Sequence, residues 1–94
     1  MAIIYSYELM PDPEQETQFR TAVAVLQASL TALEGFEGAC LVRDMNRDGT
    51  FRLDERWTSI ADHDGQSAKL DRGIMTRLME TLREEPVRRL FETE

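Results

Sequence analysis

The chain has 94 residues, 41% hydrophobic and 31% charged, and we expect a single domain over residues 1–94 with its own core. A net charge of −7 without any basic run argues against a nucleic-acid-binding surface. No apolar run approaches the roughly 20 residues that cross a bilayer, and the N-terminus lacks the pattern of a signal peptide. Cys40, the only cysteine, cannot form an internal disulfide and is predicted to be a small core residue of a buried strand. We therefore expect a cytoplasmic protein with no membrane or nucleic-acid partner.

The first two predicted elements are a strand over residues 2–9 and a helix that ends near residue 35. Alternation along the strand places four large side chains on one side: Ile3, Tyr5, Tyr7 and Leu9. Asp12 is a favourable helix N-cap, with Pro13 at the first helical position and Gln15 at the capping-box spacing. The helix interior carries one apolar stripe: Phe19, Val23, Leu26, Leu30 and Leu33. Gly35 is its predicted C-cap.

A hairpin is predicted next, from a strand over residues 36–45 and another within residues 50–59. The turn between them contains the Asp-Gly signal of a hairpin. In the second strand, three charged residues alternate with a face made of four others: Phe51, Leu53, Glu55 and Trp57. A carboxylate among Phe, Leu and Trp is costly to desolvate unless it has a hydrogen-bond or charge partner. Glu55 is therefore predicted either to bind one specific partner or to take part in chemistry.

A helical region is predicted from about residue 60 to residue 84, opened by Ser59 as a cap and interrupted near residues 71–73. Pro86 ends it, and residues 87–91 form a short last strand. The order strand, helix, strand, strand, helix, strand is that of a ferredoxin-like α+β fold, an antiparallel sheet with helices on one face. The other face mixes apolar and charged side chains, so it is either solvated or covered by a second subunit.

The motif Glu55-x-Trp57-x-Ser59, preceded by Gly-Phe-x-Gly at residues 35–38, resembles the antibiotic biosynthesis monooxygenase (ABM) family. The resemblance covers nearly the whole chain. It implies a homodimer, a dimeric α+β barrel in which the uncovered faces of two sheets meet. It also implies oxidation of phenolic or polycyclic aromatic (quinol- or anthrone-like) small molecules by O₂ without a metal or organic cofactor. Other relatives in the superfamily degrade haem, and some have no established activity.

One departure from the family pattern concerns a histidine that members usually carry nine residues after the tryptophan. Gln66 stands at that position, and the only histidine, His63, comes three residues earlier. Positions 63 and 66 share a helix face, so His63 can approach the same cavity in a different pose. The haem-degrading branch uses that histidine as iron ligand together with an asparagine on the first strand, where this chain has Tyr7 nearby. Haem cleavage is therefore the less favoured chemistry.

The resemblance implies a site with two candidate catalytic residues, His63 and Glu55. The candidate substrate-binding residues are Trp57, Tyr5, Tyr7 and Gln66. Each main candidate has a structural alternative. Trp57 is otherwise a core anchor, Glu55 a partner of a neighbouring arginine, and His63 a surface residue of its helix. The tyrosines are otherwise interior packing residues with polar tips.

Two functions are compatible with these residues. The first is a cofactor-independent monooxygenase, in which a base deprotonates the substrate and the substrate anion itself reduces O₂. The second is a non-catalytic dimeric barrel that binds a small ligand or serves an assembly role, which Gln66 in place of the usual histidine favours. The sequence has no Cys/His cluster for a metal, no glycine-rich phosphate loop and no recognisable nucleotide or flavin site, so we expect no cofactor.

Overall fold

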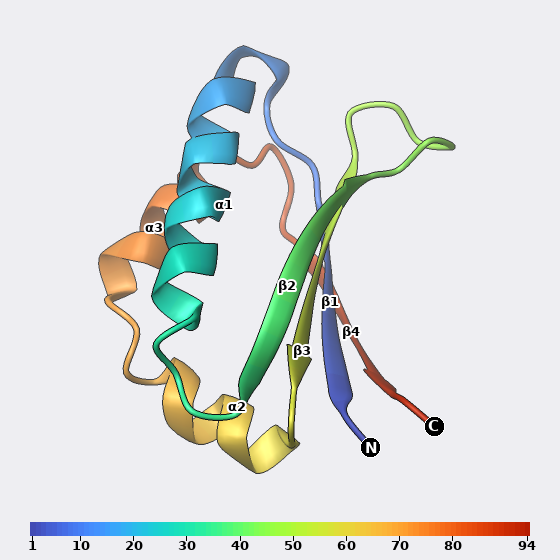
Figure 1. The fold of residues 1–94 in the computed structure, drawn as a ribbon. Helices are drawn as coiled ribbons and strands as arrows, with labels where there is room; N and C mark the ends of the chain where they lie inside the picture. The colour runs from blue at the N-terminus through green and yellow to red at the C-terminus, as the bar shows by residue number, and fades with distance from the viewer.

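The computed structural model, which describes residues 1–94, is a four-stranded antiparallel sheet with its helices on one face (Figure 1). Its elements follow in chain order: β1 (Ile3–Leu9), the short 3-10 helix η1 (Pro13–Gln15), α1 (Glu16–Leu30), β2 (Phe36–Arg43), β3 (Phe51–Trp57), α2 (Ile60–Ser67), α3 (Arg72–Glu80) and β4 (Val87–Glu92). The strands lie in the order β2-β3-β1-β4. This arrangement confirms the predicted ferredoxin-like fold.

The central strand β3 shows the predicted alternation between buried and exposed side chains. Its four inward residues are buried against the helices, whereas the intervening charged residues lie on the opposite face. The pairing register places Tyr5 of β1 and Ala39 of β2 on either side of Glu55. Because Ala39 has only a methyl side chain, the sheet leaves room beside Glu55 on the helix side.

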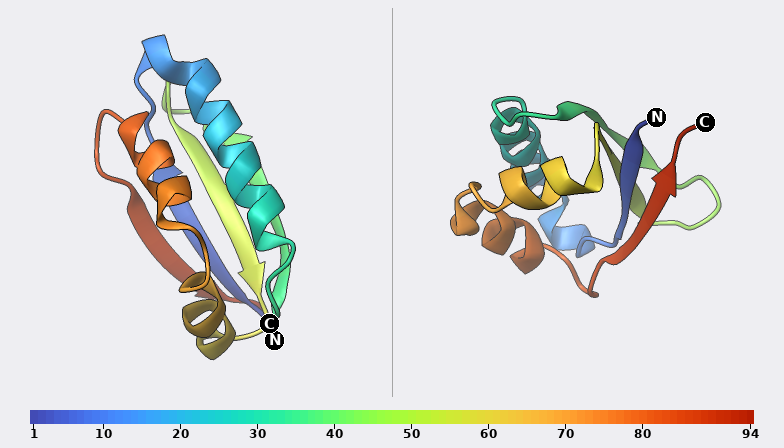
Figure 2. Two further views of the ribbon diagram at one scale, coloured as in Figure 1. Left: turned by 90° about the vertical axis from the view of Figure 1, so that its left-hand side faces the viewer. Right: turned by 90° about the horizontal axis from the view of Figure 1, so that it is seen from below.

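The helix α1 packs its apolar stripe onto the sheet, and α3 lies beside it, as Figure 2 shows from the helix side. Four residues of the predicted stripe are almost fully buried: Phe19, Val23, Leu26 and Leu30. Asp12 accepts a hydrogen bond from the Glu14 backbone N–H at 3.0 Å, as expected of an N-cap, although the first turn is 3-10. The stripe therefore fixes which side of α1 faces β1 and β3.

The prediction that Gly35 caps α1 is wrong, because the helix already ends at Leu30. Gly35 lies in the following turn with a φ of +85°, a value that favours glycine. A Cβ atom there would stand 2.6 Å from the Cβ of Asp62, so glycine also allows α2 to approach this turn closely. Gly38, the other glycine of the motif, lies at a register shift between β2 and β3.

The predicted interruption of the second helical region exists, at residues 68–71 and so slightly earlier than residues 71–73, and it separates two helices of different direction (Figure 1). Ser59 caps α2 by accepting from the Asp62 N–H at 3.0 Å, and Asp71 caps α3 by accepting from the Gly73 N–H at 2.8 Å. The region ends at Glu80, earlier than the predicted residue 84. The break places α2 across one end of the sheet and α3 against α1, as Figure 2 shows.

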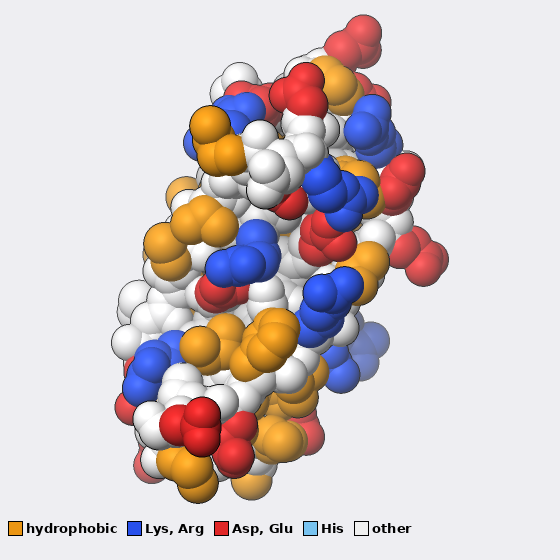
Figure 3. Space-filling model, turned by 90° about the vertical axis from the view of Figure 1, so that its right-hand side faces the viewer, with side chains coloured by type: hydrophobic (Ala, Val, Ile, Leu, Met, Phe, Trp, Pro, Cys, Tyr) orange, Lys and Arg blue, Asp and Glu red, His pale blue; other side chains and the backbone are white.

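The face of the sheet that carries no helix is a mixture of apolar, basic and acidic side chains (Figure 3). The pairing register places Ile4, Arg52, Asp54, Arg56 and Phe91 there. The prediction that Cys40 is a core residue is wrong, because it pairs with Asp54 and shares this exposed face. No helix combines the length and the apolar character that crossing a membrane requires.

Candidate functional site

A cavity of about 290 Å³ lies between the helix-covered face of the sheet and the helices. Thirteen residues line it: Tyr7, Leu9, Leu26, Leu30, Leu53, Glu55, His63, Ser67, Leu70, Met75, Leu78, Met79 and Pro86. It exists because α3 turns away from α2 at the break and packs on α1, which leaves space over β1 and β3. Met75 and Met79 are exposed members of the lining, so the cavity reaches the surface beside α3.

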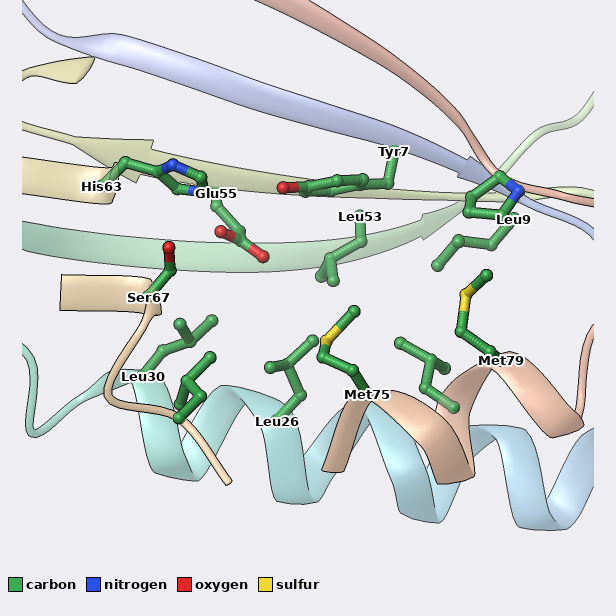
Figure 4. A pocket seen from close by; sticks show the side chains of 13 residues that line it. Tyr7, Leu9, Leu26, Leu30, Leu53, Glu55, His63, Ser67, Met75 and Met79 are labelled. Atoms are coloured by element: carbon green, nitrogen blue, oxygen red, sulfur yellow. The ribbon is translucent and has the colours of Figure 1, made fainter. Parts of the chain in front are cut away.

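The cavity has a polar end and an apolar end, as Figure 4 shows. Glu55, His63 and Ser67 lie together at one end, and the Tyr7 hydroxyl points toward Glu55. Leu9 and Met79 lie at the other end. No lysine or arginine is among the lining residues. The cavity therefore suits a compact, largely apolar molecule with a hydrogen-bonding group at one end.

Glu55 is 5% exposed, and its Oε1 atom accepts a hydrogen bond of 3.0 Å from the Trp57 indole N–H. The expectation of an arginine partner is wrong, because none of the salt bridges includes Glu55. Burial raises the pKa of the Glu55 carboxyl group above its usual value, while the Trp57 hydrogen bond and the charge of His63 partly oppose that rise. Glu55 is thus a carboxyl group that holds a proton more readily than an exposed one.

His63 is 8% exposed, so the alternative that it lies on the helix surface is wrong. Its ring stacks on the Tyr5 ring at 3.7 Å between centroids and meets the Trp57 indole edge-on at 5.2 Å. The Nδ1 atom lies 3.0 Å from Asp64 Oδ1. A carboxylate only accepts hydrogen bonds, so Nδ1 donates, and in the neutral ring Nε2 carries the lone pair that a general base needs.

Tyr7 is half-buried, and its ring forms part of the cavity wall. Burial raises the pKa of the Tyr7 phenol well above its usual value; the Glu55 charge adds to the rise, and the nearby Arg88 opposes it. The phenol therefore stays protonated at neutral pH. It is a hydrogen-bond donor directed toward the polar end of the cavity.

Three of the six predicted site residues do not line the cavity. Trp57 is fully buried behind Glu55, and Tyr5, 1% exposed, lies behind His63. The Gln66 side chain accepts a hydrogen bond from the Glu34 backbone N–H at 3.3 Å and so connects α2 to the turn before β2. Glu55, His63 and Tyr7 are the predicted residues that meet in the cavity.

Ser67 is a polar lining residue that sequence reasoning missed. Its only signal was its spacing, four residues after His63 and therefore on the same side of α2. Serine near the end of a helix is common, so the spacing alone does not distinguish it. No group of three or more His, Cys, Asp or Glu side chains is arranged to hold a metal ion.

The fold and this cavity are those of a small α+β protein of the ferredoxin-like class, with a ligand-sized site between sheet and helices. Residues 2–67 match the family described as antibiotic biosynthesis monooxygenase, and the chain belongs to that family. No curated protein matches the sequence.

Several solved structures are similar to this chain over nearly its full length. SnoaB, a cofactor-independent oxygenase from Streptomyces nogalater, has a TM-score of 0.85 at 15% identity, covering 99% of this chain and 93% of its own. A conserved protein from Methanosarcina mazei has a TM-score of 0.89 at 18% identity, covering 100% and 94%. A protein of unknown function from Bacteroides thetaiotaomicron has a TM-score of 0.83 at 16% identity, covering 98% and 97%. At these identities the likeness shows the fold alone.

Proposed function

We propose that this protein is a cofactor-independent monooxygenase that oxidises a phenolic or polycyclic aromatic (quinol- or anthrone-like) small molecule with O₂. Family membership supports the reaction class. The observation that carries the proposal is a buried carboxyl group and an imidazole side by side at the polar end of an otherwise apolar cavity. The volume of the cavity, about 290 Å³, lies at the lower end of the volumes of ligand pockets, which favours a compact substrate.

The reaction needs a proton acceptor and a dry site. Glu55 or His63 takes the acidic proton of the bound substrate, and the resulting anion gives one electron to O₂. The substrate radical and superoxide combine into a C–O bond, and the peroxide anion takes back a proton. Loss of water from the hydroperoxide leaves a carbonyl group, so one oxygen atom enters the product and the other leaves as water. The substrate supplies all the electrons.

The lining residues support these steps in different ways. The protonated Tyr7 hydroxyl donates a hydrogen bond to the oxyanion that forms at the polar end. The leucines and methionines of the lining surround the ring and exclude water from the reactive anion. Trp57, Tyr5 and Gln66 do not line the cavity, and we assign them no contact with the substrate.

The proposed assembly is a homodimer through the uncovered sheet face. Arginine and carboxylate side chains are mixed with apolar ones on that face and include the ion pair between Arg52 and Asp54 at 3.1 Å. A surface of this composition is self-complementary, because a second copy presents both charges and apolar area to it. Closing two such faces on one another forms the barrel and leaves both cavities on the helix sides.

An oxygen electrode tests the reaction. Purified protein, treated with a chelator and without added flavin, is expected to consume O₂ with at least one member of a panel of anthrones and quinols. Replacing Glu55 or His63 by Gln identifies the base, because the variant that lacks it is expected to lose about 10²–10⁴-fold in kcat. Uptake equal to that of buffer for the whole panel would contradict the enzyme proposal.

A second candidate is a barrel that binds a small ligand without turnover. It is favoured by the structural use of Gln66, which contacts Glu34 at the position where family members usually carry a histidine. The same panel separates the two candidates. Ligand binding detected by Trp57 fluorescence, without O₂ uptake and without product, supports the binding protein.

A further inference from the structure

We infer that Trp57 is a positioning residue for Glu55: its indole N–H holds one carboxylate oxygen, and the other oxygen is left free to face the cavity. The catalytic use of this contact rests on the proposed function, whereas the contact itself is measurable in the free protein. A role in binding the substrate ring is not supported, because Trp57 is fully buried and does not line the cavity.

The strand geometry explains why these two residues meet. Positions 55 and 57 project to the same side of β3, and the indole extends back along the strand until Nε1 lies 3.0 Å from Oε1 of Glu55. The carboxyl group lines the cavity, while the indole stays behind it. An indole N–H buried without an acceptor is costly, so the contact also satisfies Trp57.

The indole is itself held in one orientation from two sides. Phe36 of β2 meets it edge-on at 5.4 Å between ring centroids, with an interplanar angle of 70°. His63 of α2 meets it at 5.2 Å and 86°. A side chain packed in this way has few alternative rotamers, so its N–H is a fixed donor. Trp57 therefore contacts both candidate bases and holds only Glu55 by a hydrogen bond.

The surroundings of Glu55 determine what the contact does. Tyr5 and Tyr7 of β1 and His63 of α2 lie near the Glu55 carboxyl group. The positive charge of Arg88 in β4 opposes the rise that burial causes in the pKa of the two tyrosines. The residues of α1 and α3 that line the cavity are all apolar. Burial disfavours the carboxylate form, and a hydrogen bond donated to that form favours it. Without the indole N–H, the Glu55 carboxyl group is a weaker acid and its side chain is less ordered.

The test uses two signals that need no substrate. Trp57 is the only tryptophan and gives a single indole N–H resonance in NMR spectra. This resonance is expected to shift downfield as Glu55 ionises and to lose that pH dependence in Glu55→Gln. His63 is unchanged in that variant, so the comparison isolates the contribution of the Glu55 carboxyl group. The inference would be overturned if the chemical shift of the indole proton did not change with pH, or if it changed equally in the parent and in Glu55→Gln.

The second signal is the carboxyl ¹³C resonance of Glu55. In Trp57→Phe the ring is retained and the donor is lost, so the titration midpoint of Glu55 is expected to rise by about one pKa unit, roughly tenfold in its ionisation constant. The matched control is Phe19→Leu, which removes a buried ring contact away from the indole and keeps the Trp57 N–H and its two supporting rings. An unchanged midpoint in Trp57→Phe, or an equal rise in the control, contradicts a positioning role. Neither signal depends on turnover, so both can be interpreted even if the proposed reaction is not observed.

Discussion

The imidazole of His63 lies almost parallel to the phenol ring of Tyr5, with 3.7 Å between the ring centroids and an interplanar angle of 15°. One ring comes from α2 and the other from β1, so the stack connects the helix to the sheet at the polar end of the cavity. Together with the Asp64 contact at Nδ1, it determines how His63 is presented to the cavity.

Replacing Tyr5 by Leu is expected to destabilise the protein by about 1–3 kcal/mol, since a buried stacked ring is lost and a void remains. Tyr5→Phe keeps the ring and is expected to stay within about 0.5 kcal/mol of the parent. Urea unfolding measures both. The ring protons of the single histidine report the stack: the upfield shift caused by Tyr5 should persist in Tyr5→Phe and vanish in Tyr5→Leu. Equal spectra for the two variants would show that the rings are not stacked.

The buried carboxyl group of Glu55 makes stability depend on pH in a defined direction. Its pKa is raised in the folded state, so the folded protein binds more protons than the unfolded chain above the ordinary glutamate pKa of about 4.3. The free energy of unfolding therefore falls as pH rises from that value through the folded-state pKa. Glu55→Gln lacks this loss and can still accept from Trp57, so its stability relative to the parent should increase between pH 4 and pH 7.

Urea unfolding of the two proteins at several pH values measures that difference, in which the other carboxyl groups cancel. Glu37→Gln is the control, because Glu37 is exposed on β2 and pairs with Arg56 at 3.1 Å on the surface. A difference between parent and Glu55→Gln that does not vary with pH, or that decreases toward pH 7, would contradict a raised pKa for Glu55.

Met79 of α3 lines the cavity and is also 41% exposed, so it lies at the opening of the cavity. Met79→Trp is expected to narrow the opening and to raise the Kd of a compact aromatic probe such as 2-naphthol by roughly tenfold. The same substitution at Met45, 89% exposed in the hairpin and absent from the cavity, should leave the Kd unchanged. Isothermal titration calorimetry provides both values. Equal affinities for the parent and Met79→Trp would place the ligand elsewhere.

Substitution of Arg52 tests the proposed homodimer, because this residue lies on the uncovered sheet face with a largely exposed side chain. Arg52→Glu places like charges beside Asp54 and across the proposed interface, and we expect the dimer Kd to rise by roughly tenfold or more. Arg77→Glu on α3 changes the net charge equally and should leave the Kd unchanged. Analytical ultracentrifugation at several concentrations measures both. A parent protein that is monomeric at micromolar concentration would contradict the interface.

The fold was predictable because its main elements have strong periodicities. Alternation in β3 indicated that Glu55 points inward, and the stripe of α1 indicated which face covers it. The partner of Glu55 was not predictable, because an indole reaching back along its own strand depends on a rotamer set by Phe36 and His63. The burial of His63 depends on the direction that α2 takes before the break, which helical spacing does not specify. The position of Gln66 was not predictable from helical spacing either, because it shares a helix face with His63 and yet contacts Glu34 outside the cavity.

The most direct test of the central claim, that a substrate held in this cavity reduces O₂ by itself, is turnover of an accepted anthrone or quinol under ¹⁸O₂ with a chelator present. We predict that each product molecule carries one ¹⁸O atom in its new carbonyl group, that the second appears in water, and that adding metal or flavin does not change the rate. Product without ¹⁸O, or a reaction that proceeds only after metal or flavin is added, would contradict the account.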